Sequence, residues 1–123
     1  MANSTIKVLN IVLFLALISK GYSTCSLEDI SLTQTKTGVT IQGKPEWSVT
    51  ITNKCPCAQK NIVLDCQGFQ TVERIDPSLL DVDAKSGACV VKPNQLIYKD
   101  PVTFKYAWDN SFPLTPTFSQ RFC

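Results

Sequence analysis

The chain has 123 residues, with 12 basic and 10 acidic side chains, six cysteines and no histidine. The absence of histidine excludes Ser-His-Asp and Cys-His catalytic relays and histidine-ligated metal sites. Two of the basic residues, Lys7 and Lys20, lie in a leader-like N-terminal stretch, so the remaining chain is electrically balanced. This balance argues against nucleic acids and anionic membranes as partners, because both attract proteins with a basic excess.

The first 23 residues have the three regions of a secretory signal peptide. Residues 1–7 are polar with one positive charge, residues 8–18 are almost wholly apolar, and residues 19–23 are small and polar. The apolar run is shorter than the roughly 20 residues that a membrane-spanning helix needs. An N-terminal core helix is the alternative, but no later segment resembles its amphipathic partner. We therefore expect a signal peptide over residues 1–23 and a secreted product that does not insert into membranes.

The secreted protein is expected to begin at Thr24, or alternatively at Tyr22, and to contain no free thiol. Gly21 and Ser23 provide the small residues that precede the first of these cleavage sites. An even number of cysteines in a secreted chain predicts complete pairing. Intact-mass measurement before and after reduction and alkylation tests both points. A retained leader, or alkylation without prior reduction, would contradict them.

Downstream of the leader, the apolar pattern predicts short β-strands rather than helices. Residues 47–52 alternate apolar and polar side chains without interruption, and residues 102–108 place Val102, Phe104, Tyr106 and Trp108 on one face. In chain order, the expected strands cover residues 38–42, 47–52, 61–66, 69–72, 88–91, 96–98 and 102–108.

Other segments predict turns and extended chain. Turn residues such as Gly43, Gly68 and Gly87 separate the expected strands. Single helical turns are expected around residues 27–30 and 77–80, and the tail from residue 109 to 120 is expected to be extended. The sequence therefore predicts an all-β fold, a disulfide-stapled antiparallel β-sandwich of about seven short strands. We expect one domain, over residues 24–123.

The cysteines predict three structural disulfides. Six of them follow the leader: Cys25, Cys55, Cys57, Cys66, Cys89 and Cys123. Six cysteines allow fifteen connectivities, and a strained Cys55–Cys57 bridge is disfavoured, which leaves twelve. Bridges from Cys25 and Cys123 would restrain the two ends of the domain. A cysteine–metal site or a redox Cys-x-x-Cys motif is the alternative, but the required spacing does not occur.

The acidic residues give little indication of an enzyme. Asp81 and Asp83 match the Asp-x-Asp pattern by which many glycosyltransferases hold a metal ion, because paired carboxylates suit a divalent cation. No nucleotide-binding βαβ unit surrounds them, so a solvated acidic loop is the favoured interpretation. A glycosidase would need two carboxylates on opposite sides of a sugar, and nothing pairs any two here. We predict no catalytic residue, no metal ligand, no cofactor and no enzymatic activity.

The two tryptophans are the stronger candidates for recognition. Exposed indole rings could stack on sugars or anchor a protein interface. Trp47 and Trp108 both fall in the apolar phase of their strands, which favours core packing. The candidate binding patch combines the turn at residues 44–47, including Glu46 and Trp47, with Trp108 and Asp109. Glu46 and Asp109 are expected to be replaceable without disturbing the core.

Short motifs extend from the first to the last of the six cysteines. They are Cys25-Ser26, Asp29-Ile30, Pro45, Val49-x-Ile51-x-Asn53-x-Cys55, Leu64-x-Cys66, Gly68-Phe69, Cys89-Val90, Phe104-x-Tyr106-Ala107 and Cys123. Together they resemble the mature region of the plant Tapetum Determinant family, with all six cysteines in order. The chain departs from the founding members at Cys55-Pro56-Cys57 and at residues 108–110, and looks like a divergent, short branch.

The resemblance implies a small secreted signalling protein of the plant extracellular space, the apoplast. The founding members are ligands of a leucine-rich-repeat receptor kinase and specify tapetal cell fate in the anther. The expected partner is thus the ectodomain of such a receptor, and Glu46, Trp47, Trp108 and Asp109 are the candidate receptor-binding residues. A cell-wall carbohydrate-binding module is the main alternative, and a secreted inhibitor or defence protein also fits the composition. Coplanar exposed tryptophans would favour sugar binding, whereas buried rings would favour a protein ligand.

Overall fold

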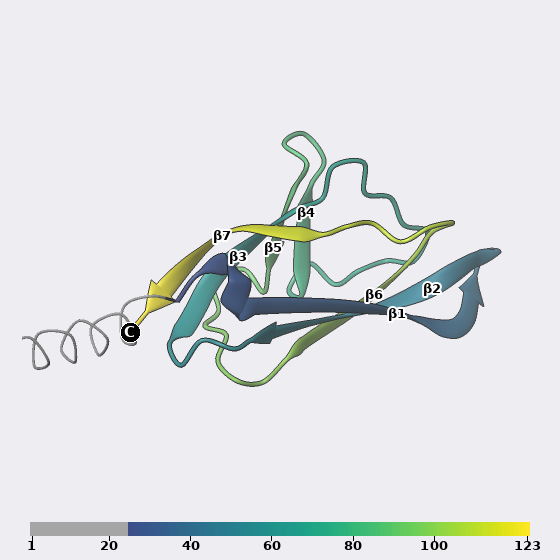
Figure 1. Ribbon diagram of the computed structural model, residues 1–123. Coiled ribbons are helices and arrows are strands. Elements are labelled where there is room, and N and C mark those ends of the chain that lie inside the picture. The colour runs from purple at the N-terminus through teal and green to yellow at the C-terminus, as the bar shows by residue number, and fades with distance from the viewer. Residues whose placement is uncertain (1–24) are drawn as a thin grey trace, which may run out of the picture.

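The computed structural model describes residues 25–123, which form two antiparallel β-sheets (Figure 1). The expected signal peptide and the expected start at Thr24 lie outside the described residues. The elements are a 3-10 helix (Leu27–Asp29) and strands β1 (Ile30–Ile41), β2 (Lys44–Asn53), β3 (Ala58–Asp65), β4 (Leu80–Asp83), β5 (Ala88–Val91), β6 (Val102–Ala107) and β7 (Thr115–Phe122). Within the described range, no helix has the length and apolar character needed to cross a membrane. The prediction of a disulfide-stapled all-β fold is confirmed.

The first sheet has three strands in the order β1-β2-β6. The register of β2 and β6 aligns Val49 with Phe104 and Ile51 with Val102, and all four side chains are buried. Thr50 lies between Val49 and Ile51 and is only half-buried, as expected for a strand with one face on the core. Both strands that alternate most clearly in the sequence are therefore confirmed.

The β1–β2 hairpin is longer than predicted and extends past the body of the sandwich (Figure 1). Its turn at Gln42 and Gly43 has φ values of 49° and 79°, the left-handed conformations that two-residue hairpin turns prefer. The expected strand at residues 38–42 is only the end of β1. The earlier part of β1 was not predicted because its apolar alternation is limited to Ile30 and Leu32, and the following residues 35–40 of this edge strand are exposed.

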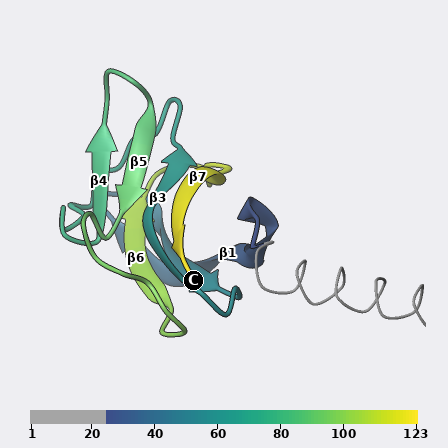
Figure 2. The same ribbon diagram turned by 90° about the vertical axis from the view of Figure 1, so that its left-hand side faces the viewer.

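The second sheet has four strands, which follow one another in the order β4-β5-β3-β7 (Figure 2). Leu64 on β3 pairs with Cys89 on β5, while Val91 lies between Ile62 and Leu80 on its two neighbours. These five side chains are buried and face the first sheet. The core thus fills the space between the sheets, as in other β-sandwiches.

Two expected strands do not form as predicted. Residues 69–72 belong to the long connection between β3 and β4, and they have no strand structure. The expected strand at residues 96–98 is reduced to one isolated bridge, in which Gln59 pairs with Ile97.

Two strands of the second sheet were not predicted. Strand β4 contains Asp81 and Asp83, which were interpreted as part of an acidic loop. Strand β7 comes from the predicted extended tail and pairs with β3, opposing Val63 and Phe118. Pro116 is tolerated in β7 because this strand lies at the edge of the sheet.

A buried polar network joins β2, β3 and the connection before β6. The Asn53 amide donates hydrogen bonds to the carbonyl oxygens of Cys57 (3.0 Å) and Ile97 (2.9 Å). In return, Asn53 Oδ1 accepts hydrogen bonds from the Cys55 N–H (3.0 Å) and from Gln59 Nε2 (2.9 Å). Asn53 therefore supplies the partners that buried backbone and side-chain groups require.

The six cysteines form three disulfides: Cys25–Cys55, Cys57–Cys123 and Cys66–Cys89. No cysteine is free within residues 25–123. The expectation of complete pairing and the exclusion of Cys55–Cys57 are both confirmed. The first two bridges fasten residues 25 and 123 to the segment between β2 and β3, whereas the third lies in the core between β3 and β5.

Candidate functional site

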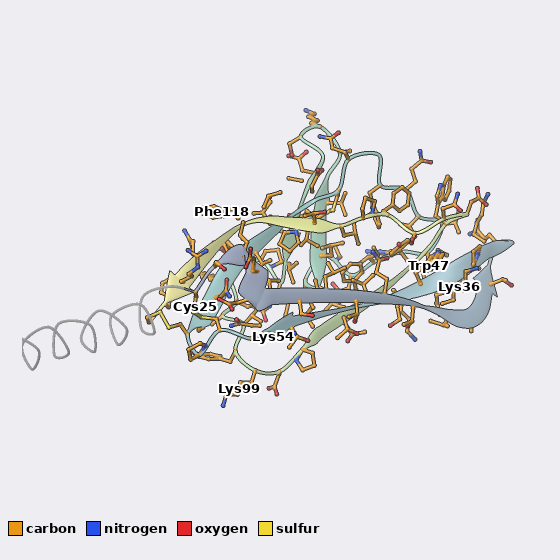
Figure 3. The ribbon with its side chains drawn as sticks, viewed as in Figure 1. Cys25, Lys36, Trp47, Lys54, Lys99 and Phe118 are labelled. Atoms are coloured by element: carbon orange, nitrogen blue, oxygen red, sulfur yellow. A yellow bond between two sulfur atoms is a disulfide. The ribbon has the colours of Figure 1, made fainter. Side chains whose placement is uncertain are left out.

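Trp47 lies on β2 and packs its indole ring partly against the core. In the sheet it is paired with Lys36 on β1 and with Tyr106 on β6. The Lys36 ammonium lies 5.3 Å from the centroid of the indole (Figure 3). Cation–π contacts of this kind contribute about 0.5–1 kcal/mol at exposed sites. Trp47 is thus half-buried, with one ring face in contact with a cation.

Trp108 follows β6 and forms a second pair of the same kind. Lys44 Nζ lies 5.0 Å from the Trp108 ring centroid and binds the two Asp109 carboxylate oxygens at 2.8 and 2.9 Å. Trp47 Nε1 donates a hydrogen bond to the Trp108 carbonyl oxygen at 3.3 Å, which joins the two pairs. We call Lys36, Lys44, Trp47, Trp108 and Asp109 the tryptophan patch.

The structure brings together three of the four predicted recognition residues, namely Trp47, Trp108 and Asp109. The sequence did not point to Lys36, because its position opposite Trp47 depends on an irregular register between β1 and β2. The pairing next to the hairpin turn, Thr40 with Pro45, would place Gly38 opposite Trp47 if it continued. A register shift between Lys36 and Thr40 places Lys36 there instead, and Gly38 within the shift has a φ of 88°. Only this glycine, in a Thr-rich stretch, gave a sequence indication of a bulge.

The structure places Glu46, the fourth predicted residue, under cover rather than in an exposed turn. It lies on β2, and only 6% of its surface is exposed. Its Oε1 accepts a hydrogen bond from the Thr37 hydroxyl at 2.8 Å, and this bond lowers the pKa of the Glu46 carboxyl. The Glu73 side chain, from the β3–β4 connection, also lowers the pKa of this carboxyl. Glu46 therefore faces other residues of this chain in the described conformation.

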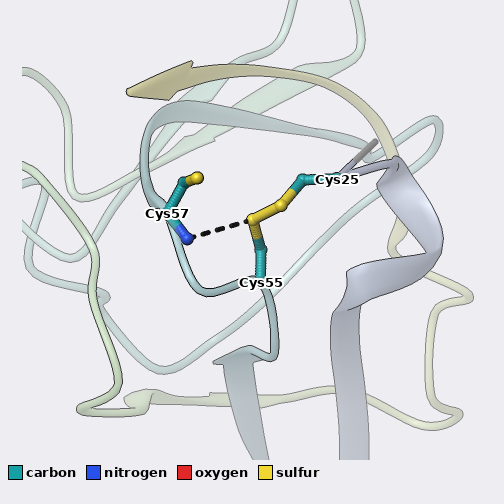
Figure 4. A group of neighbouring side chains, drawn as sticks. All are labelled: Cys25, Cys55 and Cys57. Carbon is teal, nitrogen blue, oxygen red and sulfur yellow. Dashed lines mark hydrogen bonds between the residues drawn. A yellow bond between two sulfur atoms is a disulfide. The ribbon is translucent and has the colours of Figure 1, made fainter. Parts of the chain in front are cut away.

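Three cysteine sulfurs gather where residue 25 meets the β2–β3 connection (Figure 4). The sulfur atoms of Cys25, Cys55 and Cys57 lie within 4.8 Å of one another. All three are bound in disulfides, so none can offer the thiolate that a metal ion requires. The Cys57 N–H donates a hydrogen bond to Cys55 Sγ at 3.3 Å. This cluster fastens the domain rather than presenting a metal site.

The Asp81–Asp83 pair has a local structural role. Asp83 Oδ1 accepts a hydrogen bond from the Lys85 N–H at 3.0 Å, which holds the pKa of Asp83 below its ordinary value. The bond supports the turn between β4 and β5. Both carboxylates are exposed, and the two residues lie on the same side of β4, because positions two apart on a strand share a face.

Comparison with protein families gives one match. The family described as "Tapetum determinant 1, C-terminal" matches residues 26–123, which is nearly the whole described range. Searches of curated proteins and of solved structures found no match.

Proposed function

Because the chain belongs to the Tapetum determinant 1 family, we propose that it is an extracellular signalling ligand that binds the ectodomain of a leucine-rich-repeat receptor kinase. The family match over residues 26–123 carries the proposal. Family membership supports a tapetum-determinant signalling role in general, and this is a signalling family rather than an enzyme family. Three disulfides in a small cysteine-rich domain suggest an extracellular protein.

The tryptophan patch is the proposed contact surface. Interfaces of standard size bury about 800 Å² per partner and depend on a few aromatic or arginine anchors. Trp47 and Trp108 supply aromatic area at one end of the three-stranded sheet, and Asp109 has a largely exposed side chain beside them. A solenoid receptor offers an extended surface against which such a compact end can dock.

The arrangement of the tryptophan rings favours a protein partner over a polysaccharide. Sugar-binding platforms need open ring faces on which a pyranose can stack. Here both rings are half-buried against the core, and a lysine ammonium lies over each of them. A sugar would have to displace Lys36 from Trp47 or Lys44 from Trp108. The carbohydrate-binding module therefore remains the second candidate.

Reversing the charge of Asp109 is expected to weaken receptor binding about tenfold, because Asp109→Lys would place a third cation beside Lys36 and Lys44. The matched control is Asp100→Lys, since Asp100 is also exposed and precedes β6 whereas Asp109 follows it. Calorimetry against a panel of leucine-rich-repeat ectodomains, and against cellulose, xylan and pectin fragments, provides the measurement. Binding to a polysaccharide with no receptor binding would contradict the proposal, and equal affinities of the two variants would exclude the patch.

A further inference from the structure

Strand β4 forms an open edge of the four-stranded sheet (Figure 2). The hydrogen bonds at its two ends identify the backbone groups that face its neighbour β5. The Leu79 carbonyl oxygen accepts a hydrogen bond from the Lys92 N–H at 2.9 Å, and the Asp83 carbonyl oxygen accepts one from the Gly87 N–H at 2.9 Å. Successive residues of a strand direct their backbone groups to alternate edges. Every second residue from 79 to 83 therefore faces β5.

The intervening residues, Leu80 and Val82, direct their backbone groups to the open edge. The Leu80 N–H agrees with this direction, because it donates to the Asp76 carbonyl oxygen in the β3–β4 connection at 3.1 Å. Among residues 25–123, no hydrogen bond reaches the Leu80 carbonyl oxygen or the N–H and carbonyl groups of Val82. Unpaired groups along a sheet edge are a template for a further strand. Strand β4 therefore offers one donor and two acceptors to a partner.

Two cavities lie along this open edge. The larger has a volume of about 510 Å³ and is lined by residues 69–75, 77 and 80–82. The smaller has a volume of about 160 Å³ and is lined by residues 66–70, 82–84 and 87. Both include Phe69, Gln70 and Val82, so they adjoin and form one groove between β4 and the β3–β4 connection. We call it the β4 groove.

The two sides of β4 present different chemistry to this groove. Leu80 faces the core, and Val82 on the same side is 39% exposed. Asp81 and Asp83 share the other side and are exposed. A strand added beside β4 would alternate in the same way, because side chains on adjacent strands pair on the same face. Its apolar side chains would lie beside Val82 and Phe69, and the side chains between them would lie beside two carboxylates.

The charge of the groove selects the kind of partner. The charged side chains that line it are Glu73, Asp81, Asp83 and Arg74, which give an acidic excess. Opposite charges on adjacent strands stabilise their pairing, whereas like charges directly opposite each other destabilise it. The groove therefore favours lysine or arginine beside Asp81 and Asp83, and it disfavours an acidic segment.

We propose that the β4 groove binds an extended segment of a partner protein in which apolar and basic residues alternate. The segment adds a fifth strand to the sheet. In this mode of binding, main-chain hydrogen bonds supply affinity and pockets for alternate side chains supply specificity. The four residues of β4 span about 13 Å, so about four residues of the segment pair directly. The residues of the tryptophan patch lie outside the groove lining, so this second surface does not depend on the proposed receptor.

Capped heptapeptides provide the probes, and fluorescence anisotropy measures their affinity for the disulfide-bonded protein. A peptide of alternating lysine and valine should bind about tenfold more tightly than a peptide of alternating glutamate and valine. The lysine peptide with N-methylated backbone amides keeps its charge but cannot complete the edge hydrogen bonds, so it should bind about tenfold more weakly than the unmethylated form. Equal binding of the methylated peptide would show attraction by charge alone and would overturn the proposal. Failure of the lysine peptide to bind would also overturn it.

Variants of β4 test whether the peptide occupies this edge. Val82→Pro removes the N–H that faces the groove and should weaken binding of the lysine peptide about tenfold. Proline is tolerated here because the lost N–H lies on the open side of an edge strand. Val82→Thr is the matched control, since it keeps the N–H and the branched shape, and its affinity should stay within about twofold. Unchanged binding by Val82→Pro would place the peptide elsewhere and overturn the proposal.

Reversing one charge tests the predicted partner chemistry. Asp81→Lys should weaken the lysine peptide about fivefold and strengthen the glutamate peptide about fivefold. Asp100→Lys is the matched control, because Asp100 is exposed and lies outside the groove lining, and it should preserve both affinities. Equal effects of the two variants would show that the groove does not select the charge of its partner.

Two measurements on the unmodified protein keep the test independent of variant folding. Hydrogen exchange of the Val82 amide should slow about tenfold at saturating lysine peptide, because the amide gains a main-chain acceptor. Unchanged exchange of this amide would refute the added strand. Sedimentation velocity of the protein alone should give a monomer. A dimer that Val82→Pro dissociates would overturn the proposal, because a second copy of the chain would then occupy the edge.

Discussion

Replacing both Cys66 and Cys89 with alanine is expected to lower the free energy of unfolding by about 2–5 kcal/mol. Both residues are buried, with 4% and 0% of their surfaces exposed, and their bridge joins the end of β3 to β5 inside the core. The double variant avoids a free thiol and an added hydroxyl, either of which Cys66→Ser would leave in the core. Denaturant unfolding of purified protein, together with secreted yield, measures the effect.

The matched variant replaces Cys57 and Cys123, whose bridge spans 66 residues rather than 23. Loop-closure entropy alone predicts a loss about 1 kcal/mol larger for this longer loop. Cys123 is exposed, however, so the end of β7 can fray without unfolding the core, and this fraying should reduce the difference. If the Cys66→Ala/Cys89→Ala protein has the same free energy of unfolding as the unmodified protein, the Cys66–Cys89 bridge does not stabilise the core.

Truncation of Tyr106 to alanine is expected to cost about 3–5 kcal/mol, because Tyr106 is fully buried in the core. Its ring packs edge-on against Phe69 at 5.1 Å between centroids, and it also contacts Phe112 at 5.9 Å. Its hydroxyl donates to Gln34 Oε1 at 2.5 Å and accepts the Phe112 N–H at 3.0 Å. The ring and the hydroxyl therefore join β1, β6, the β3–β4 connection and the chain before β7.

Tyr106→Phe separates the two contributions. It keeps the ring but leaves Gln34 Oε1 and the Phe112 N–H without their partner, so we expect a loss of about 1–3 kcal/mol. Tyr98→Phe is the control, because Tyr98 is 60% exposed and should change stability by less than about 0.5 kcal/mol. Denaturant unfolding gives the three values. Equal stability of Tyr106→Phe and the unmodified protein would show that the hydroxyl contributes no net stability.

Strands were predictable where one face is buried along the whole strand. Val49 and Ile51 on β2, and Phe104 and Tyr106 on β6, give the alternation that identifies such strands. Strand β4 gave no such pattern because it is a short edge strand with three exposed residues out of four. Strand β7 contains Pro116 and is defined by its pairing with β3, a long-range contact that no local pattern encodes.

The prediction of a strand at residues 69–72 was wrong because apolar residues can be buried outside strands. Phe69 is apolar because it belongs to the aromatic cluster with Tyr106 and Phe112, not because it lies in a strand. Val72 makes one backbone hydrogen bond to Ala107, which is too little to form a strand. The burial of Glu46 was unpredictable for a related reason, because a charged residue beside a turn gives no local indication that it will be buried.

The positions of the two disulfide-fastened ends have a practical consequence for binding assays. Cys25 lies at one end of the sandwich and Trp47 at the other, while the C-terminal end of the described chain is beside Cys25 (Figure 3, Figure 1). Cys123 is held at that same end through its bridge to Cys57. An affinity tag or fluorophore joined next to residue 25 or residue 123 would therefore point away from the tryptophan patch. Immobilisation through either terminus would present the hairpin end outward, in one orientation, to a receptor in solution.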